Sequence, residues 1–142
     1  MKYIAKKSGN EPESLKLYRE TTPNATYEGF ADSDQLLKKA LLAEQGYICS
    51  YCMQRISLKT NKQHKLRIEV EHIASQKNYP YKALAFTNMA GVCNGNIGGM
   101  EHCDKSKKDK ELHILFPHNE TCEQYITYST SGKILQKYLT VQ

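Results

Sequence analysis

Cys49-Ser50-Tyr51-Cys52 begins the stretch that decides the fold, and Cys93 and Cys103 close it. Two residues separate the first two cysteines, a spacing that lets both thiolates bind one zinc ion. The two later cysteines complete a closed tetrahedral site. The chain between them is polar and loop-rich, so metal binding would supply folding free energy that its few apolar residues lack. We therefore predict a structural Zn²⁺ on Cys49, Cys52, Cys93 and Cys103.

Two alternatives to this ligand set remain open. The four thiols could be buried without a metal, or His102 could replace its neighbour Cys103 as the fourth ligand. Cys122 is an odd fifth cysteine and is expected to be a free thiol. In a reducing cytoplasm, cysteines bind metals more often than they form disulfides.

The chain has 142 residues, 39% of them hydrophobic and none of them Trp, which predicts a single domain with a modest core. We divide it into an irregular N-terminal segment (1–31), a zinc-bound core (32–112) and a C-terminal tail (113–142). It has no apolar run of about 18 residues and no signal-like N-terminus, so we expect a cytoplasmic protein without membrane spans.

The first regular elements are expected to be helices. A short helix can form over 14–19, and an amphipathic helix is predicted over 33–45 because its leucines recur on one face. Asp32 or Ser33 is the candidate N-cap, and Gly46 is a natural C-terminal stop. This helix would lead directly into the first cysteine pair.

Alternation of apolar and charged residues predicts the first long strand. Leu66, Ile68 and Val70 alternate with Arg67 and Glu69, which gives one apolar face. The other expected elements are a strand within 84–92, a short basic helix over 103–112, and a hairpin over 126–134.

A carboxylate and an imidazole are adjacent where the first strand ends. Glu71-His72 lies between the two cysteine pairs. A histidine can act as general base near neutral pH, and a carboxylate can hold a hard divalent cation beside it. A strand, a loop, a strand and a helix, with metal ligands at the junctions, outline a ββα-metal fold of the α+β class with flanking helices.

At this point the residues resemble a known family. The segments that carry the resemblance are Val70-Glu71-His72-Ile73, Thr87-Asn88-Met89, Cys93, and Cys103-Asp104-Lys105-Ser106-Lys107. Together they look like the core of an HNH (His-Me finger) endonuclease. More widely, residues 1–130 resemble the PtuB-like branch of Septu anti-phage defence and its retron-associated relatives.

The resemblance implies a role for each matched residue. His72 would be the general base, Glu71 and Asp104 would hold a catalytic Mg²⁺ or Mn²⁺, and Asn88 would orient the loop opposite the base. Three lysines would contact the nucleic-acid backbone, namely Lys105, Lys107 and Lys108. The chain departs from the family in having Glu71 where Asp is common, Asp104 where His or Asn is common, and nine residues between its last two cysteines.

The function implied is metal-dependent hydrolysis of nucleic-acid phosphodiesters, with DNA favoured over RNA. The net charge of +5 and the basic 105–110 segment suit a phosphate-binding protein. The resemblance further implies a nuclease subunit of an antiviral complex with an ABC/SMC-type (PtuA-like) ATPase, docked through residues 1–31 or the tail. The alternative is a non-catalytic zinc module that binds nucleic acid or a protein partner.

Overall fold

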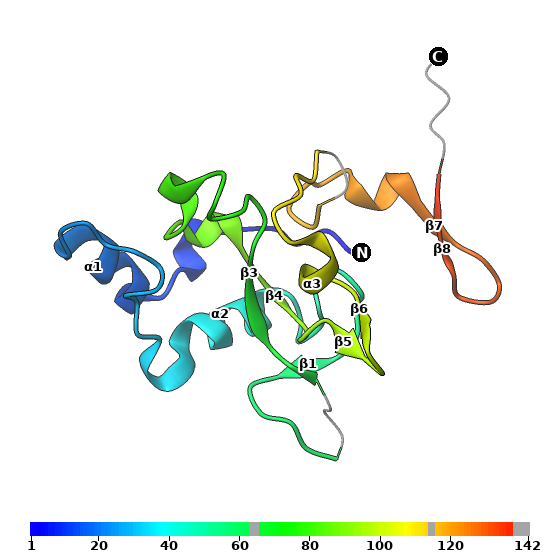
Figure 1. The fold of residues 1–142 in the computed structure, drawn as a ribbon, viewed down its shortest axis with the longest axis horizontal. Coiled ribbons are helices and arrows are strands. Elements are labelled where there is room, and N and C mark those ends of the chain that lie inside the picture. The colour runs from blue at the N-terminus through cyan, green and yellow to red at the C-terminus, as the bar shows by residue number, and fades with distance from the viewer. Residues whose placement is uncertain (63–65, 114–115, 138–142) are drawn as a thin grey trace.

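The computed structural model describes residues 1–62, 66–113 and 116–137 and shows a mixed α+β domain (Figure 1). Residues 63–65, 114–115 and 138–142, which fall in an expected loop and in the expected tail, lie outside the described part. The short 3₁₀ turns are η1 (Ser8–Asn10), η2 (Ser33–Gln35), η3 (Pro80–Lys82), η4 (Phe86–Asn88) and η5 (Cys122–Tyr125). No helix among these described residues is long and apolar enough to cross a membrane.

The core forms where helix α2 (Leu36–Glu44) packs against strand β4 (Met89–Val92). All four residues of β4 are buried, and Leu37 and Leu41 of α2 are fully buried. The helix begins three residues later than predicted, because residues 33–35 form a separate turn with left-handed φ angles at Asp34 and Gln35. Asp32 still caps α2, since its carboxylate accepts the Leu37 amide at 2.8 Å.

Strand β3 (Glu69–His72) pairs antiparallel with β4 in the register Glu71↔Ala90 and His72↔Met89. The predicted strand over 66–71 is instead two short pieces. Leu66–Arg67 forms β2, which pairs in parallel with β1 (Ile56–Ser57), and the buried Ile68 separates β2 from β3. The strand expected within 84–92 is limited to β4, because the 3₁₀ turns η3 and η4 occupy the residues before it.

The nine residues between Cys93 and Cys103 form a miniature hairpin of β5 (Asn96–Ile97) and β6 (Met100–Glu101). The hairpin folds the chain back, so that the His102 amide donates to the Gly95 carbonyl at 2.8 Å. Gly95 has φ of +66°, and an added Cβ would lie 2.5 Å from the His102 carbonyl oxygen. Only glycine therefore allows this close return of the chain.

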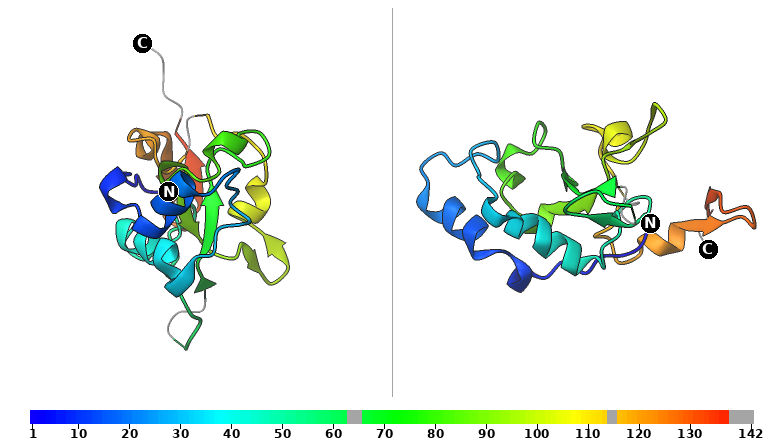
Figure 2. Two further views of the ribbon diagram at one scale, coloured as in Figure 1. Left: turned by 90° about the vertical axis from the view of Figure 1, so that its left-hand side faces the viewer. Right: turned by 90° about the horizontal axis from the view of Figure 1, so that it is seen from below.

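Helix α3 (Asp104–Lys107) follows the hairpin and is a single turn, shorter than the helix expected over 103–112. It ends at Lys108, which has φ of +52°. The views in Figures 1 and 2 show α3 beside the β3–β4 pair, so that strand, strand and helix lie together.

The N-terminal segment is less irregular than expected. It contains α1 (Glu13–Thr21), whose Leu15 is fully buried in the core. The Arg19 side chain, which pairs with Glu11, also donates to the Leu84 carbonyl at 2.9 Å. Residues 1–31 are thus part of the domain, and removing them would expose the core.

The expected C-terminal hairpin is present as β7 (Ile126–Tyr128) and β8 (Ile134–Gln136). It projects from one end of the molecule, opposite the end that carries α1 (Figures 1 and 2). Every residue of β8 is exposed. The hairpin therefore contributes little to the core.

Candidate functional site

Four cysteine sulfurs lie together at one end of the core. The Sγ atoms of Cys49 and Cys103 are 3.8 Å apart, those of Cys52 and Cys93 are 3.9 Å apart, and all four lie within 4.8 Å of one another. A tetrahedron with zinc–sulfur distances of about 2.3 Å places its sulfurs about 3.8 Å apart. The four cysteines therefore fit a metal ion such as zinc, as the sequence predicted.

Backbone geometry prepares this cluster. The amide of Met53 donates to the Cys49 carbonyl at 2.9 Å, and Met53 has φ of +62°, so the C-x-x-C segment folds into a tight knuckle. The Cys93 amide donates to the Cys49 sulfur at 3.4 Å. Thus β4 delivers Cys93 to the knuckle, and the β5–β6 hairpin returns the chain with Cys103.

Crowded thiols without a cation oppose one another's ionisation. Burial raises the pKa of Cys93 to about 12, while hydrogen bonding with Cys103 and Cys52 lowers the pKa of Cys49. Hydrogen bonds from neighbouring thiols thus favour ionisation of Cys49, whereas burial opposes ionisation of Cys93. A bound divalent cation would allow further thiols to ionise, which is the chemistry of a thiolate-bound metal.

His102 lies beside the cluster but is not one of the four grouped ligands. Its Nδ1 is 3.1 Å from the sulfur of Cys103 and 3.8 Å from that of Cys93, while its Nε2 is buried without a partner among the described residues. Cys103 itself contacts Cys49 across the cluster. The geometry therefore favours Cys103 over His102 as the fourth ligand.

A second polar cluster lies between β3 and α3. The Glu71 side chain, which is 5% exposed, accepts a hydrogen bond from the Tyr51 hydroxyl at 2.9 Å. Its Oε1 also pairs with Lys107 Nζ at 2.8 Å, and Asp104, the first residue of α3, lies close enough to Glu71 to raise its pKa. The two carboxylates predicted to share a metal ion are therefore neighbours.

The electrostatics of this pair are unfavourable without a cation. Burial, together with the hydrogen bond with Asp104, raises the pKa of Glu71 to about 7, although Lys107 opposes the change. Burial and the nearby Glu71 charge likewise raise the pKa of Tyr51, which stays a hydrogen-bond donor. Two acidic groups forced together in this way form a pair that a hard divalent cation would stabilise.

His72 ends β3 next to this cluster and is 6% exposed. Its Nε2 lies 2.8 Å from the Ala83 carbonyl oxygen. A carbonyl can only accept, so Nε2 carries the proton and Nδ1 keeps its lone pair. The ring of Tyr27 packs edge-on against the imidazole, with centroids 4.6 Å apart. Burial lowers the pKa of His72 below its ordinary 6.5, so the ring is neutral at pH 7.

Asn88 holds the loop that follows His72. Its Oδ1 accepts the Ala74 amide at 2.8 Å, and its Nδ2 donates to the Ala74 carbonyl at 3.0 Å and to the Lys82 carbonyl at 3.3 Å. These bonds fix the loop after β3 and the turn that carries Ala83. The side chain thus acts on backbone position rather than on a ligand.

The three predicted backbone-binding lysines separate into two kinds. Lys105 and Lys108 are exposed, whereas Lys107 is buried, pairs with Glu71 and donates to the His72 carbonyl at 3.3 Å. Its charge thus stabilises the carboxylate cluster inside the domain. The prediction that Lys107 contacts the nucleic-acid backbone therefore does not fit its buried position.

Lys107→Ala is expected to lower the free energy of unfolding by about 3–5 kcal/mol when no divalent cation is added, because Glu71 would lose its buried cation. Thermal unfolding followed by circular dichroism measures the change. Lys105→Ala, in the same turn of helix but exposed, should stay within about 0.5 kcal/mol of the parent. Equal stability of the two variants would contradict the structural role of Lys107.

Sequence reasoning missed three parts of this site. Tyr51 was noted only as a residue of the knuckle, Tyr27 was not singled out, and the Ala83 carbonyl is a backbone group without a sequence signal. The one sequence feature that pointed to a role for Tyr51 was its position between Cys49 and Cys52.

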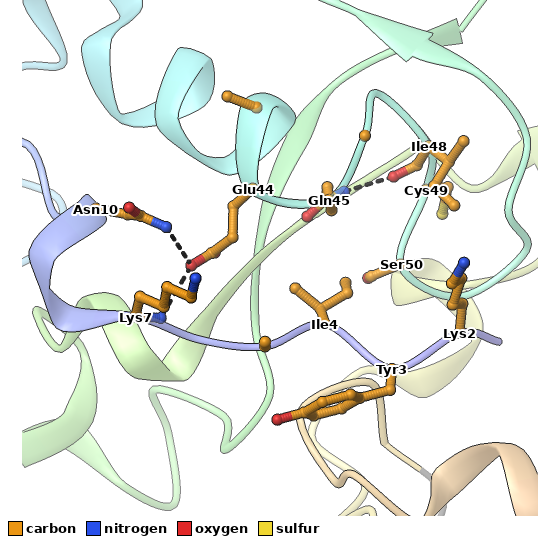
Figure 3. Close-up of a pocket in the computed structure, with 13 residues that line it drawn as sticks. Lys2, Tyr3, Ile4, Lys7, Asn10, Glu44, Gln45, Ile48, Cys49 and Ser50 are labelled. Carbon is orange, nitrogen blue, oxygen red and sulfur yellow. Dashed lines mark hydrogen bonds between the residues drawn. The ribbon is translucent and has the colours of Figure 1, made fainter.

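A cavity of about 600 Å³ lies between residues 2–10, the end of α2 and the knuckle, and Cys49 is the one residue of the cysteine cluster among its described lining residues (Figure 3). Glu44, at its edge, accepts hydrogen bonds from Asn10 and from the Lys7 amide. Glu71, His72 and Asp104 are absent from the described residues that line it. It is therefore separate from the carboxylate–histidine site.

No family model matches the sequence, and no curated protein matches it. The functional assignment therefore rests on the residues and their geometry.

Proposed function

We propose that this chain is a metal-dependent endonuclease of the HNH type, built on a ββα-metal core. The observation that carries the proposal is the buried Glu71 carboxylate with the half-buried Asp104 close to it, beside a neutral histidine whose Nε2 donates to the Ala83 carbonyl, so that Nδ1 keeps its lone pair. β3, β4 and α3 supply the two strands and the helix of such a core. The cysteine cluster supplies a separate structural metal, proposed to be Zn²⁺.

In the proposed mechanism His72 accepts a proton at Nδ1 from the water that attacks the phosphorus. The Ala83 carbonyl fixes the tautomer needed for this step, and Asn88 holds the backbone on both sides of the ring. Glu71 and Asp104 would hold the catalytic cation, proposed to be Mg²⁺ or Mn²⁺. When bound, that cation would stabilise the charge that develops on the phosphate and on the leaving 3′ oxygen.

Lys105 and Lys108 are proposed to contact the nucleic-acid backbone. Both are exposed on or next to α3, close to Asp104 in sequence. Contacts of this kind position a strand without reading its sequence, so they suit a nuclease of low sequence selectivity. DNA is the proposed substrate, with RNA as the comparison.

The proposal is tested by cleavage of plasmid DNA and oligonucleotides with the purified zinc-loaded chain. Cleavage should require Mg²⁺ or Mn²⁺ and should fall at least about a hundredfold in Asp104→Ala and Glu71→Ala, because each removes a ligand oxygen. Glu69→Ala is the matched control, since that carboxylate is on the same strand but half exposed. Binding without cleavage under all metal conditions would favour the non-catalytic zinc module.

We also propose that the chain is the nuclease subunit of an antiviral complex with an ABC/SMC-type ATPase, acting in the cytoplasm. Two exposed apolar surfaces are available for docking. Leu17 on α1 is 54% exposed, and on β8 Ile134 is 56% and Leu135 is 45% exposed. The hairpin is the stronger candidate because it projects from the domain.

Leu135→Asp is expected to weaken co-purification with such an ATPase at least about tenfold, because a charge would be buried in an apolar contact. Leu17→Asp is the matched variant on the other surface, and it should have little effect if the hairpin is the docking element. Zinc content and nicking by the isolated chain should stay at the parental level in both. Loss of the complex in Leu17→Asp alone would assign docking to α1.

A further inference from the structure

A groove of about 550 Å³ lies between the loop 22–28 and the turn 80–84. Its volume is within the range of about 300–1,000 Å³ that is usual for small-molecule sites. None of the four cysteines and none of the carboxylates of the proposed metal site lines it. The groove is therefore a separate feature that the proposed mechanism does not use.

Two of its lining residues contact the proposed general base directly. Tyr27 packs edge-on against the His72 ring at 4.6 Å, and the Ala83 carbonyl lies 2.8 Å from His72 Nε2. The Asn88 amide also bonds the Lys82 carbonyl, which fixes the turn that forms one wall. Tyr27 and Ala83 thus lie between the groove and His72. Their contacts with the imidazole fix the position of the groove wall relative to it.

An aromatic side chain is exposed at the groove. Tyr81 is 77% exposed, although a large apolar ring gains by burial. Tyr79 packs edge-on against it, and the ammonium of Lys82 lies 5.7 Å from the Tyr81 ring centroid. An exposed ring with a neighbouring cation is a suitable surface for a nucleobase, which stacks on the ring while the cation is near its phosphate.

The rest of the lining suits a neutral polar group better than a phosphate. Asn24, Thr26 and Gln76 offer amide and hydroxyl groups, which can both donate and accept hydrogen bonds. Among the described lining residues, Arg19 is the only basic one, and it is already paired with Glu11 and bonded to Leu84. An anionic phosphate would therefore find no unpaired cation inside the groove.

We propose that this groove binds an unpaired nucleobase of the substrate strand, next to the scissile phosphate, with Tyr81 as the stacking surface. This inference rests on the proposed function and specifies its substrate: a single strand, or a duplex with a displaced base, is bound in preference to a regular duplex. A base held in a regular duplex stack cannot enter the groove, because both of its faces are covered.

Tyr81→Trp provides a direct test, because the chain has no other Trp and the exposed side chain tolerates the change. In an Asp104→Ala background with Mg²⁺, which leaves the groove contacts of His72 in place, single-stranded DNA or RNA oligonucleotides should quench the introduced indole, and a blunt regular duplex should not. Quenching by only DNA or only RNA would show which sugar, deoxyribose or ribose, the substrate strand contains. The control is Tyr47→Trp, at a residue that is 51% exposed and does not line the groove. Unchanged indole fluorescence, or equal quenching by the duplex, would overturn the proposal.

Affinity gives a second measurement. Tyr81→Ala should weaken binding of single strands about tenfold or more, whereas Tyr81→Phe should retain it, since stacking needs the ring and not the hydroxyl. Parental affinity in Tyr81→Ala would overturn the groove assignment. These readouts do not depend on cleavage. If oligonucleotides bind and quench the indole but the parental chain cleaves no substrate, the proposed nuclease activity is refuted and the groove assignment stands. If the parental chain cleaves but no quenching occurs, the groove assignment is refuted and the nuclease activity stands.

Discussion

A chain carrying Cys49→Ser or Cys52→Ser is expected to be unfolded or molten rather than folded and inactive. Zinc binding supplies on the order of 10 kcal/mol in small zinc modules, which is as large as the whole stability of a typical domain. The four sulfurs join the knuckle, β4 and the start of α3, so losing one ligand releases all three. Near-UV circular dichroism and zinc content by elemental analysis measure the result.

Cys122→Ala is the matched control for that experiment. Cys122 is also buried but does not belong to the four-sulfur cluster, so its change should leave zinc content at the parental level. Removal of zinc by a strong chelator should reproduce the effect of the cysteine variants. A well-folded parental chain without zinc would contradict the prediction.

His72→Ala is expected to reduce cleavage by about 10²–10⁴-fold, because general-base catalysis contributes an acceleration of that size. The zinc content should be unchanged, because His72 is not among the four ligands. Some stability should be lost, since the ring is buried against Tyr27. Cleavage kinetics with saturating Mg²⁺ or Mn²⁺ measure the effect.

His113→Ala is the control, because that side chain is 81% exposed. Cleavage by the parental chain should also decline as the pH falls through the pKa of His72, which lies below 6.5, because the protonated ring cannot accept the proton of water. Parental rates in His72→Ala would exclude it as the general base.

The metal cluster and the order of its surrounding elements could be predicted because they depend on residue identity. Four cysteines at suitable spacing form a site in almost any local backbone. The extents of the elements could not be predicted in the same way. The alternation over 66–71 looked like one strand with an apolar face, yet the strand is interrupted at Ile68 and both Glu71 and His72 are buried.

In the candidate catalytic site, too, the residue types could be predicted but some of their roles could not. Glu71, His72 and Asp104 were identifiable from their types and order, and the structure brings the first and last together. The role of Lys107 was missed because its sequence context is a run of exposed lysines. Only the three-dimensional position of one turn of helix turns that side chain inward.

That turn of helix also determines how accurately Asp104 is placed. A helix of four residues has no independent stability, since isolated helices shorter than about 12–15 residues are marginal in water. Asp104 directly follows Cys103 in the chain, so the position of this proposed metal-binding cysteine largely determines the position of Asp104. In the proposed arrangement, the bonds from the structural metal to its cysteines fix the position of Cys103. They thereby also fix the position of Asp104 and of the catalytic cation that it would hold. Substitutions around the cluster that keep all four cysteines but shift their positions slightly would then alter cleavage before they alter the fold.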